Sequence, residues 1–239
     1  MFFDQDEFDV RCEWGSAGLA RLVLTSDAIV IVDVLSFSTC VDVAVGRGAL
    51  VYPFRWKEAS AVSYARSLDA VLANPERTSA TGYSLAPSSL LGIPAGTRLV
   101  LPSPNGAALT LATGGRPTFA GCLRNAVAVA EAAQKIGPRI GIVPAGERWP
   151  DGSLRPALED WTGAGAIIAH LRGTRSPEAS VAEAAFKHVQ PDLTSCLERC
   201  SSGKELIGRG FATDVALAAA LNRSHCAPRL KEGAYTVNP

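Results

Sequence analysis

Apolar positions along this chain fall into two kinds of segment, continuous runs and runs with helical spacing. Residues 28–34 read AIVIVDV, a nearly continuous β-branched run, which is typical of a parallel strand covered by helices on both faces. The stretch that follows predicts a helix, because Ser38 or Thr39 can cap its start and Gly48 can end it. Residues 49–54 then predict a second strand.

The same order of strand and helix continues along the chain. Residues 57–70 have apolar side chains at helical spacing. Further elements are predicted as strands over residues 98–102, 117–121 and 139–146, and as helices over residues 107–112, 122–137, 159–171 and within 176–222, with a capping box at 202–205 and a last strand at 228–237. This alternation predicts an α/β fold, a three-layer α/β/α arrangement around a mainly parallel or mixed sheet.

Length and composition indicate one domain over residues 1–239, with a two-lobed form as an alternative. The chain has 239 residues, 47% of them hydrophobic, which is enough to bury a sizeable core. Its six cysteines do not indicate a disulfide framework in a chain of this length. The cysteines and histidines near the C-terminus contain no tight CxxC pair, so we interpret them as buried thiols rather than a zinc site.

Charge and hydropathy exclude several classes of partner. The chain carries 23 basic and 23 acidic residues, so its formal net charge is zero, and no basic block points to nucleic acid or a membrane surface. No apolar run approaches the ~18 residues of a membrane span, and the N-terminus lacks the pattern of a signal peptide. We therefore expect a cytoplasmic protein, and the sequence leaves a homodimer open.

Candidate chemistry lies where the predicted strands end. In an open α/β sheet, ligands bind beyond the carboxyl ends of the strands, and four strands here end in polar residues. Asp33 ends the first, and the others are followed by Ser103, Asn105 and Gly106, by Arg124 and Asn125, and by Glu147, Arg148, Asp151, Arg155, Glu159 and Asp160. We expect these side chains to meet at one edge of the sheet.

The segment Ser103-Pro104-Asn105-Gly106 has two interpretations. It can be a simple Asn-Gly turn before a helix. It can also hold an oxyanion with backbone N–H groups at a positive helix terminus, where Gly106 lets a ligand approach closely. Taken alone, the segment favours the simple turn, and both interpretations stay open. In the second, Arg124 and Asn125 are the other half of the cradle, and we expect an exposed loop whose substitution affects binding more than stability.

Residues 145–166 form the densest polar stretch, which includes a predicted polar loop between the strand at 139–146 and the helix at 159–171. Its carboxylates, together with Asp33, predict a magnesium site, because Mg²⁺ prefers oxygen ligands and shares phosphate oxygens with a substrate. The predicted metal ligands are Asp33, Glu147, Glu159 and Asp160. Glu159 and Asp160 lie ~100° apart around a helix, so only one of them can point squarely at the site.

The arginines of this stretch, Arg148 and Arg155, can neutralise the non-bridging oxygens of a bound phosphate. Asp33 can be a metal ligand, a base or a nucleophile, or only a cap of the following turn. The haloacid dehalogenase phosphatases also begin with an aspartate at a strand end, but they have a second aspartate two residues later, where this chain has Leu35. That family is therefore disfavoured.

Taken in order, five segments resemble the 2-phosphosulfolactate phosphatase family: VDVLSFSTCVDVAVGRGA, LPSPNGAAL, AGCLRNAVAVA, AGERWPDGSLRPALEDWTGAGA and CSSGKELIGRGFATDV. The match extends from about Phe8 to Tyr235. The resemblance implies a Mg²⁺-dependent acid phosphatase with an α/β fold, which converts 2-phospho-3-sulfolactate into 3-sulfolactate and phosphate in coenzyme M biosynthesis. Carried over by motif, the residues lining its site would be Asp33, Ser103, Asn105, Arg124, Asn125, Glu147, Arg148, Glu159 and Asp160. For catalysis we single out Asp33, Glu147 and Asp160.

One position departs from the pattern of that family. Many members have arginine directly after D-V-L, whereas this chain has Ser36, followed by Phe37. The reaction class is therefore better supported than the substrate, which we expect to be a small anionic phosphate ester. Two alternatives stay open at this point. One is a phosphatase of the same fold that acts on another 2-phospho-carboxylate, and the other is an anion-binding protein without catalytic activity.

Overall fold

The computed structural model describes residues 3–55, 60–78 and 82–237. Within them, nine strands form one mixed sheet in the order β1-β7-β2-β6-β10-β11-β3-β5-β4. Their bounds are β1 Val10–Cys12, β2 Ala28–Val32, β3 Leu50–Arg55, β4 Val71–Leu72, β5 Arg98–Ser103, β6 Thr118–Gly121, β7 Ile140–Pro144, β10 Arg229–Lys231 and β11 Ala234–Thr236. The predicted α/β class is confirmed.

The sheet consists of two parallel blocks joined by an antiparallel hairpin. Strands β1, β7, β2 and β6 pair in parallel, and so do β3, β5 and β4. The hairpin of β10 and β11 lies between the blocks, antiparallel to β6 on one side and to β3 on the other. Its two-residue turn is Glu232-Gly233, with φ of 52° and 83°, as a type I′ turn requires. This turn divides the single last strand expected from the sequence into two.

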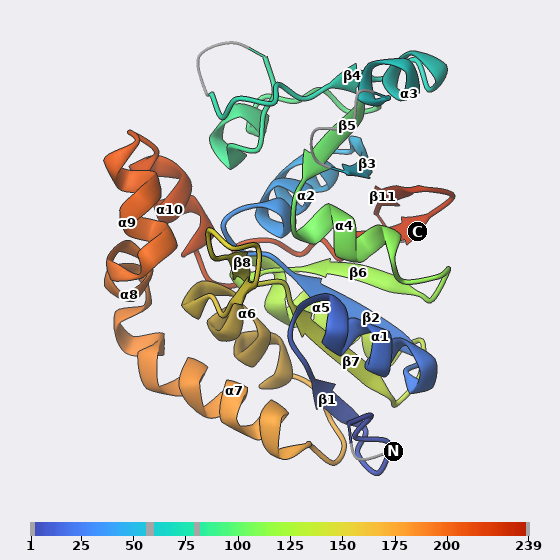
Figure 1. Cartoon of the computed structure of the whole chain (residues 1–239), viewed down its shortest axis with the longest axis vertical. Helices are drawn as coiled ribbons and strands as arrows, with labels where there is room; N and C mark the ends of the chain where they lie inside the picture. Colours follow the sequence, from blue (N-terminus) through green and yellow to red (C-terminus); the bar gives the residue numbers. More distant parts are fainter. Residues whose placement is uncertain (1–2, 56–59, 79–81, 238–239) are drawn as a thin grey trace.

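Helices cover both faces of the first block (Figure 1). Helices α1 (Gly15–Thr25) and α4 (Gly106–Leu111) pack with Ile29 and Ile31 of β2. Helices α5 (Ala126–Gln134) and α6 (Leu158–Ile168) pack with Val30 and Val32, which point to the other face. The continuous β-branched run of β2 is thus buried on both sides, as its pattern predicts.

The second block, which consists of β3, β5 and β4, packs against two further helices. Helix α2 (Phe37–Gly46) forms a core with Val51, Leu99 and Leu101, and α3 (Ala61–Ser67) packs near Tyr52 and Val100. The helix predicted from residue 57 is confirmed in this part, while residues 57–59 lie outside the described residues.

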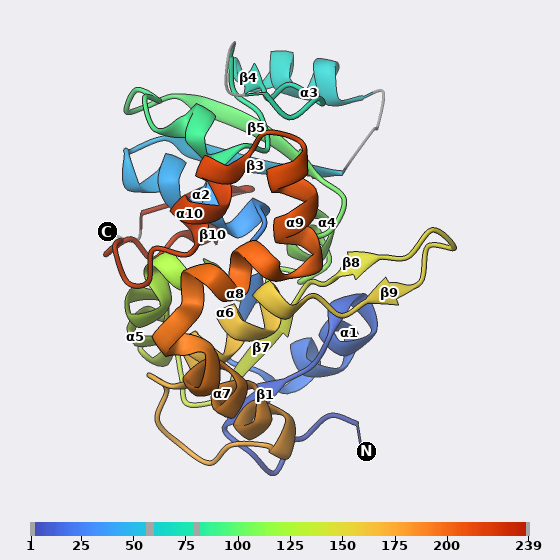
Figure 2. The same cartoon turned by 90° about the vertical axis from the view of Figure 1, so that its left-hand side faces the viewer.

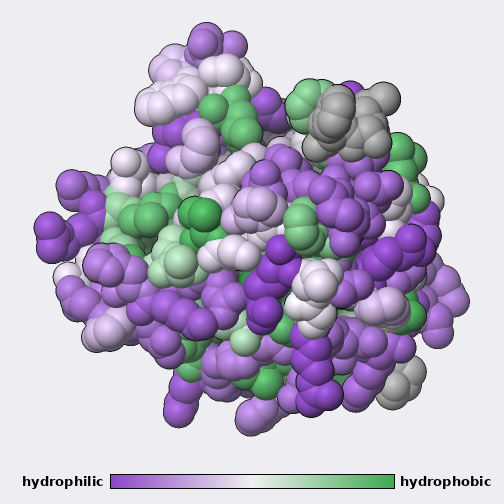
Figure 3. All heavy atoms as spheres, turned by 90° about the horizontal axis from the view of Figure 1, so that it is seen from below, coloured by the Kyte–Doolittle hydropathy of each residue, from purple (hydrophilic) through white to green (hydrophobic). Residues whose placement is uncertain are grey.

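The C-terminal helices follow one another along one side of the molecule (Figure 2). They are α7 Pro177–Val189, α8 Leu193–Arg199, α9 Ser201–Gly208 and α10 Ala212–Ala218. Seen from below, where α7 lies, hydrophilic residues cover most of the surface and hydrophobic residues gather in a smaller area (Figure 3). Helix α7 buries Ala179, Ala182 and Phe186. None of the described helices is long and apolar enough to cross a membrane.

Three local predictions are wrong. Helix α2 has its N-cap at Ser36, because the Ser38 hydroxyl bonds to Ile31 O and Asp33 N instead. The capping box predicted at Ser202 does not form, since the N-cap of α9 is Cys200, two residues earlier, and the Cys200 sulfur accepts from Gly203 N. The segment after β7, predicted as a polar loop, contains a hairpin of β8 (Glu147–Arg148) and β9 (Leu154–Arg155), which projects from the molecule in Figure 2.

Candidate active site

The buried Asp33 carboxylate stands directly after β2 and joins two helix N-termini. Its Oδ1 accepts a hydrogen bond from Phe37 N at 3.0 Å, and its Oδ2 accepts one from Gly106 N at 2.8 Å. These residues begin α2 and α4, where backbone N–H groups favour negative charge. Burial raises the pKa of Asp33, and the two N–H groups oppose that shift.

The segment 103–106 therefore holds an oxyanion that belongs to the protein itself. Gly106 N–H binds Asp33, and Ser103 and Gly106 are buried rather than exposed. A Cβ built on Gly106 would lie 2.4 Å from Phe37 Cδ1 and 2.8 Å from Asp33 Oδ2. Substitution at Gly106 thus affects packing as well as binding, which corrects the expectation of a loop that buries little.

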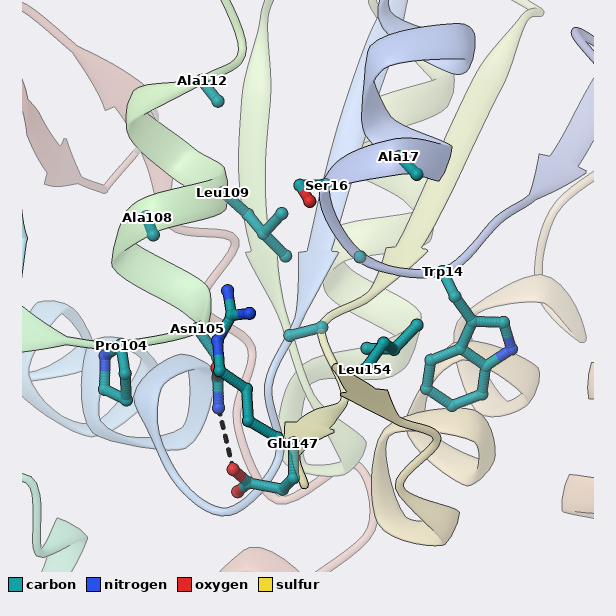
Figure 4. A pocket seen from close by; sticks show the side chains of 13 residues that line it. Trp14, Ser16, Ala17, Pro104, Asn105, Ala108, Leu109, Ala112, Glu147 and Leu154 are labelled. Atoms are coloured by element: carbon teal, nitrogen blue, oxygen red, sulfur yellow. Dashed lines mark hydrogen bonds between the residues drawn. The ribbon is translucent and has the colours of Figure 1, made fainter. Parts of the chain in front are cut away.

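Asn105 joins α4 to the projecting hairpin. Its Nδ2 donates to Oε2 of Glu147 at 2.9 Å, as Figure 4 shows. Burial, and then the charge of Asp33, raise the pKa of Glu147 to about 7, while the Asn105 hydrogen bond opposes this. Asn105 therefore orients a carboxyl group that titrates near neutral pH.

Asp33, Asn105 and Glu147 face a polar cavity of about 140 Å³, which we call the Asp33 cavity. It is also lined by Leu35, Ser36, Arg77, Leu85, Ser103, Pro104, Ser202, Glu205, Leu206 and Arg209. A second hollow, of about 190 Å³, shares Asn105 and Glu147 and extends between α4 and the start of α1 (Figure 4). The strand-end side chains that meet at the Asp33 cavity are thus Asp33, Ser103, Asn105 and Glu147.

Four polar residues of the Asp33 cavity were not singled out from the sequence. Arg77 comes from the segment after β4, and Ser202, Glu205 and Arg209 come from the region of α9. Arg77 Nη2 donates to Ser36 Oγ at 3.0 Å. Its guanidinium therefore lies beside the position at which many members of the family named in the sequence analysis have arginine. The only sequence signal for the α9 residues is that they belong to the segment CSSGKELIGRGFATDV.

Asp160 and Glu159 are buried but do not line the Asp33 cavity. Asp160 accepts from Val34 N at 2.7 Å and from Gly146 N at 2.9 Å, so it ties the end of β2 to the end of β7. Burial, and then the charges of Asp33 and Glu159, raise the pKa of Asp160 well above its usual range. Glu159 Oε2 instead accepts from the Cys200 thiol at 3.4 Å.

Arg124 and Asn125 lie elsewhere, so the two predicted halves of the cradle do not meet. Arg124 Nε pairs with Asp42 of α2 at 2.9 Å and lines a separate hollow with Arg223 and His225. Asn125 accepts from Cys122 N and donates to Ala120 O. The buried Asp42 attracts the Arg124 guanidinium, and the Asn125 amide satisfies the backbone at the end of β6.

The two arginines of the hairpin lie beside different hollows of the surface. Arg148 is exposed, donates to Gly152 O at 2.9 Å and borders the second hollow. Arg155 Nη2 donates at 3.1 Å to the hydroxyl of Ser202, which lines the Asp33 cavity. Asp151 accepts from Ser153 within the hairpin turn. Arg155 is therefore the hairpin arginine that is hydrogen-bonded to a residue of the Asp33 cavity.

The four-carboxylate metal site predicted from the sequence is not assembled among the described residues, where no group of three or more His, Cys, Asp or Glu side chains is arranged to hold a metal ion. Asp33 and Glu147 nevertheless face one cavity, and Asp33 charge raises the pKa of Glu147. Mg²⁺ commonly binds one or two carboxylates together with substrate phosphate oxygens. This pair fits that donor set, whereas Glu159 and Asp160 do not line the cavity.

The raised pKa of Glu147 predicts a pH dependence of stability in metal-free protein. Glu147 keeps its proton to about pH 7 in the folded state but loses it near its ordinary value of 4.5 when unfolded. Its contribution to stability is therefore present below about pH 4.5 and is lost as pH rises through 7. Urea midpoints in EDTA between these values should fall less in Glu147→Gln than in the wild type, and equal slopes would contradict the prediction.

Close packing at Gly106 predicts a stability effect. Gly106→Ala should lower the free energy of unfolding by about 1–3 kcal/mol, as overpacking in a core does, because its Cβ meets Phe37 and Asp33. Gly208→Ala is the matched control, since it is also helical and its Cβ would meet nothing within 4 Å. Denaturant titration of both variants tests this, and equal stabilities would show that the site relaxes without strain.

Comparison with known proteins finds a matching family and several similar proteins. The model of a family described as 2-phosphosulpholactate phosphatase matches residues 19–233. A probable 2-phosphosulfolactate phosphatase of Carboxydothermus hydrogenoformans is 32% identical over 221 residues, which cover 88% of this chain and 90% of that protein. The 2-phosphosulfolactate phosphatase of Methanothermobacter thermautotrophicus is 31% identical over 212 residues, covering 87% and 88% of the two chains.

Proposed function

Because the chain belongs to the 2-phosphosulfolactate phosphatase family and is thus a phosphatase, a phosphoric monoester hydrolase, we propose that it hydrolyses 2-phospho-3-sulfolactate in the Asp33 cavity. The observation that carries this assignment is the buried Asp33 carboxylate, held by two helix N-termini beside Glu147 in a polar cavity. Because the family is one of phosphatases, membership of it argues against the alternative of an anion-binding protein without catalytic activity.

We propose that Asp33 and Glu147 hold Mg²⁺ in the working enzyme. When bound, the ion neutralises charge on the phosphoryl oxygens. Asn105 fixes the orientation of Glu147 through its 2.9 Å hydrogen bond. The backbone N–H groups of Phe37 and Gly106 hold both oxygens of Asp33 in place and favour its charged form, against the effect of burial. Asp160 acts indirectly, because it positions the ends of β2 and β7 that carry Asp33 and Glu147.

The hydrolysis transfers the phosphoryl group to water. A water oxygen forms a bond to phosphorus as the bond between phosphorus and the ester oxygen breaks. One proton of that water ends on the ester oxygen, which becomes the hydroxyl group of 3-sulfolactate, and the other stays with the phosphate. Cationic side chains near the cavity, including Arg77 and Arg155, favour the anionic substrate.

Phosphate release from a set of related esters tests this assignment. We expect the largest kcat/KM with 2-phospho-3-sulfolactate and a smaller one with 2-phospholactate, which lacks the sulfonate. Equal or higher values for 2-phospholactate would favour the alternative of another 2-phospho-carboxylate. Release from neither ester would contradict the proposed substrate class.

A further inference from the structure

Arg77 is the most buried cation of the Asp33 cavity. Only 9% of its side chain is exposed, compared with 54% for Arg209, which also lines the cavity. Arg77 Nη1 donates to Asp214 Oδ2 at 3.1 Å, and Nη2 donates to Ser36 Oγ at 3.0 Å. These described hydrogen bonds use two of the five N–H donors that a guanidinium has. The group is thus fixed in place while it borders the cavity.

The counter-charge of Arg77 lies behind it. Asp214 is fully buried, does not line the cavity, and accepts a further hydrogen bond from Ser88 N at 3.0 Å. The Arg77 guanidinium also lies 5.5 Å from the centre of the Phe211 ring, where a cation is attracted to the aromatic face. These contacts orient Arg77 before any substrate arrives, so binding an anion there requires little rearrangement.

The cavity therefore has two chemically different sets of groups. Asp33 and Glu147 are carboxylates, whereas Arg77 presents a fixed positive charge. Arg209 is also cationic, but it is exposed and its partner Glu205, at 3.2 Å, lines the same cavity. Its burial and its partner outside the cavity thus favour Arg77 over Arg209 as the anchor for a second anionic group of the substrate.

We propose that Arg77 is a specificity-determining residue, which binds one of the two anionic groups that do not react, the carboxylate or the sulfonate. Arg77 would then let the site distinguish such a substrate from a simple alkyl phosphate, which has no second anionic group. A guanidinium suits such planar or tetrahedral oxyanions because its N–H donors can bind two oxygens at once. The inference rests on the proposed function, since it names what distinguishes the substrates of that same site.

The test compares 2-phospho-3-sulfolactate with isopropyl phosphate, a secondary phosphate ester without a second anion. In Arg77→Gln, kcat/KM for 2-phospho-3-sulfolactate should fall by about 10- to 100-fold, the range of a lost charge-assisted hydrogen bond, mainly through KM. The value for isopropyl phosphate should change less than about threefold. Arg77→Lys should fall between the wild type and Arg77→Gln, because it keeps the charge but not the fork.

A second readout is the binding of each product by calorimetry. Arg77→Gln should weaken 3-sulfolactate by about 10-fold or more and leave inorganic phosphate nearly unchanged. Because Arg77→Gln leaves Asp214 buried without its partner, the double variant Arg77→Gln/Asp214→Asn repeats the measurements with both charges removed. The matched control is Arg139→Gln, whose arginine pairs with Asp27 and does not line the Asp33 cavity.

The outcomes separate this inference from the proposed function. If kcat/KM in folded Arg77→Gln is unchanged with both esters, or falls by the same factor with both, the role of Arg77 is overturned. The phosphatase assignment is left intact by either result. A wild type that releases phosphate from neither ester would contradict the proposed function and this inference with it. A selective loss with 2-phospho-3-sulfolactate, absent in Arg139→Gln, would support both.

Discussion

Asp33→Asn should lower kcat for phosphate release by at least about 10²-fold, the usual size of a lost electrostatic or acid–base group. The substitution keeps the size of the side chain but removes its charge. It also replaces one carboxylate oxygen by an NH2 group. That group would point at the backbone N–H of Phe37 or Gly106, so that two hydrogen-bond donors would meet. Steady-state kinetics, with circular dichroism to confirm the fold, would measure this effect.

The control for Asp33 is Asp151→Asn. Asp151 also comes from the polar residues after a strand, but it is exposed and bonds only within the hairpin turn among the described contacts. Its replacement should change kcat by less than about twofold, as is usual for surface positions. A fall under threefold in folded Asp33→Asn would reduce Asp33 to a cap that joins α2 and α4.

Removal of divalent cations should reduce turnover by at least about 10²-fold, since the ion would supply the charge neutralisation that two carboxylates cannot. Mg²⁺ or Mn²⁺ should restore activity after EDTA is removed. Glu147→Gln, which takes away one of the two carboxylates facing the cavity, should raise the concentration of Mg²⁺ needed for half-maximal activity. Full turnover after exhaustive chelation would contradict this part of the proposal.

Much of the fold could be predicted from hydrophobic patterning. Strands β2, β6 and β7 are buried along their whole length, and each was predicted from an apolar run such as residues 28–32. Helix α1 was missed because its sequence, GSAGLARLVLT, begins with small residues and has no side-chain cap. The position of the β10–β11 hairpin depends on pairing with β6 and β3, which are distant in sequence, so local patterns could not place it.

The candidate site was predicted in part. The rule that polar residues gather beyond strand ends brought Asp33, Asn105 and Glu147 to one cavity. The same rule does not say in which direction a side chain turns, and the buried Asp42 of α2 draws Arg124 away. Arg77 could not be found from the sequence, because Asp214, which holds it, lies 137 positions away.

Several predictions concern properties that do not follow from the fold of a single chain. The roles of the site residues, the requirement for Mg²⁺ and the cytoplasmic location stay predictions, and the alternative of a homodimer stays open. The roles and the metal depend on chemistry with substrate bound, and the location and the dimer depend on the cell and on a second copy of the chain. The experiments above address the first two.

The most direct test of the central claim is the rate of phosphate release from 2-phospho-3-sulfolactate at pH 7 with Mg²⁺, measured side by side for the wild type, Asp33→Asn and Asp151→Asn. Hydrolysis in the Asp33 cavity predicts turnover by the wild type and by Asp151→Asn, with Asp33→Asn slower by about 10²-fold or more. A wild type that releases no phosphate, or an Asp33→Asn variant that matches it, would contradict the assignment of this cavity as the active site.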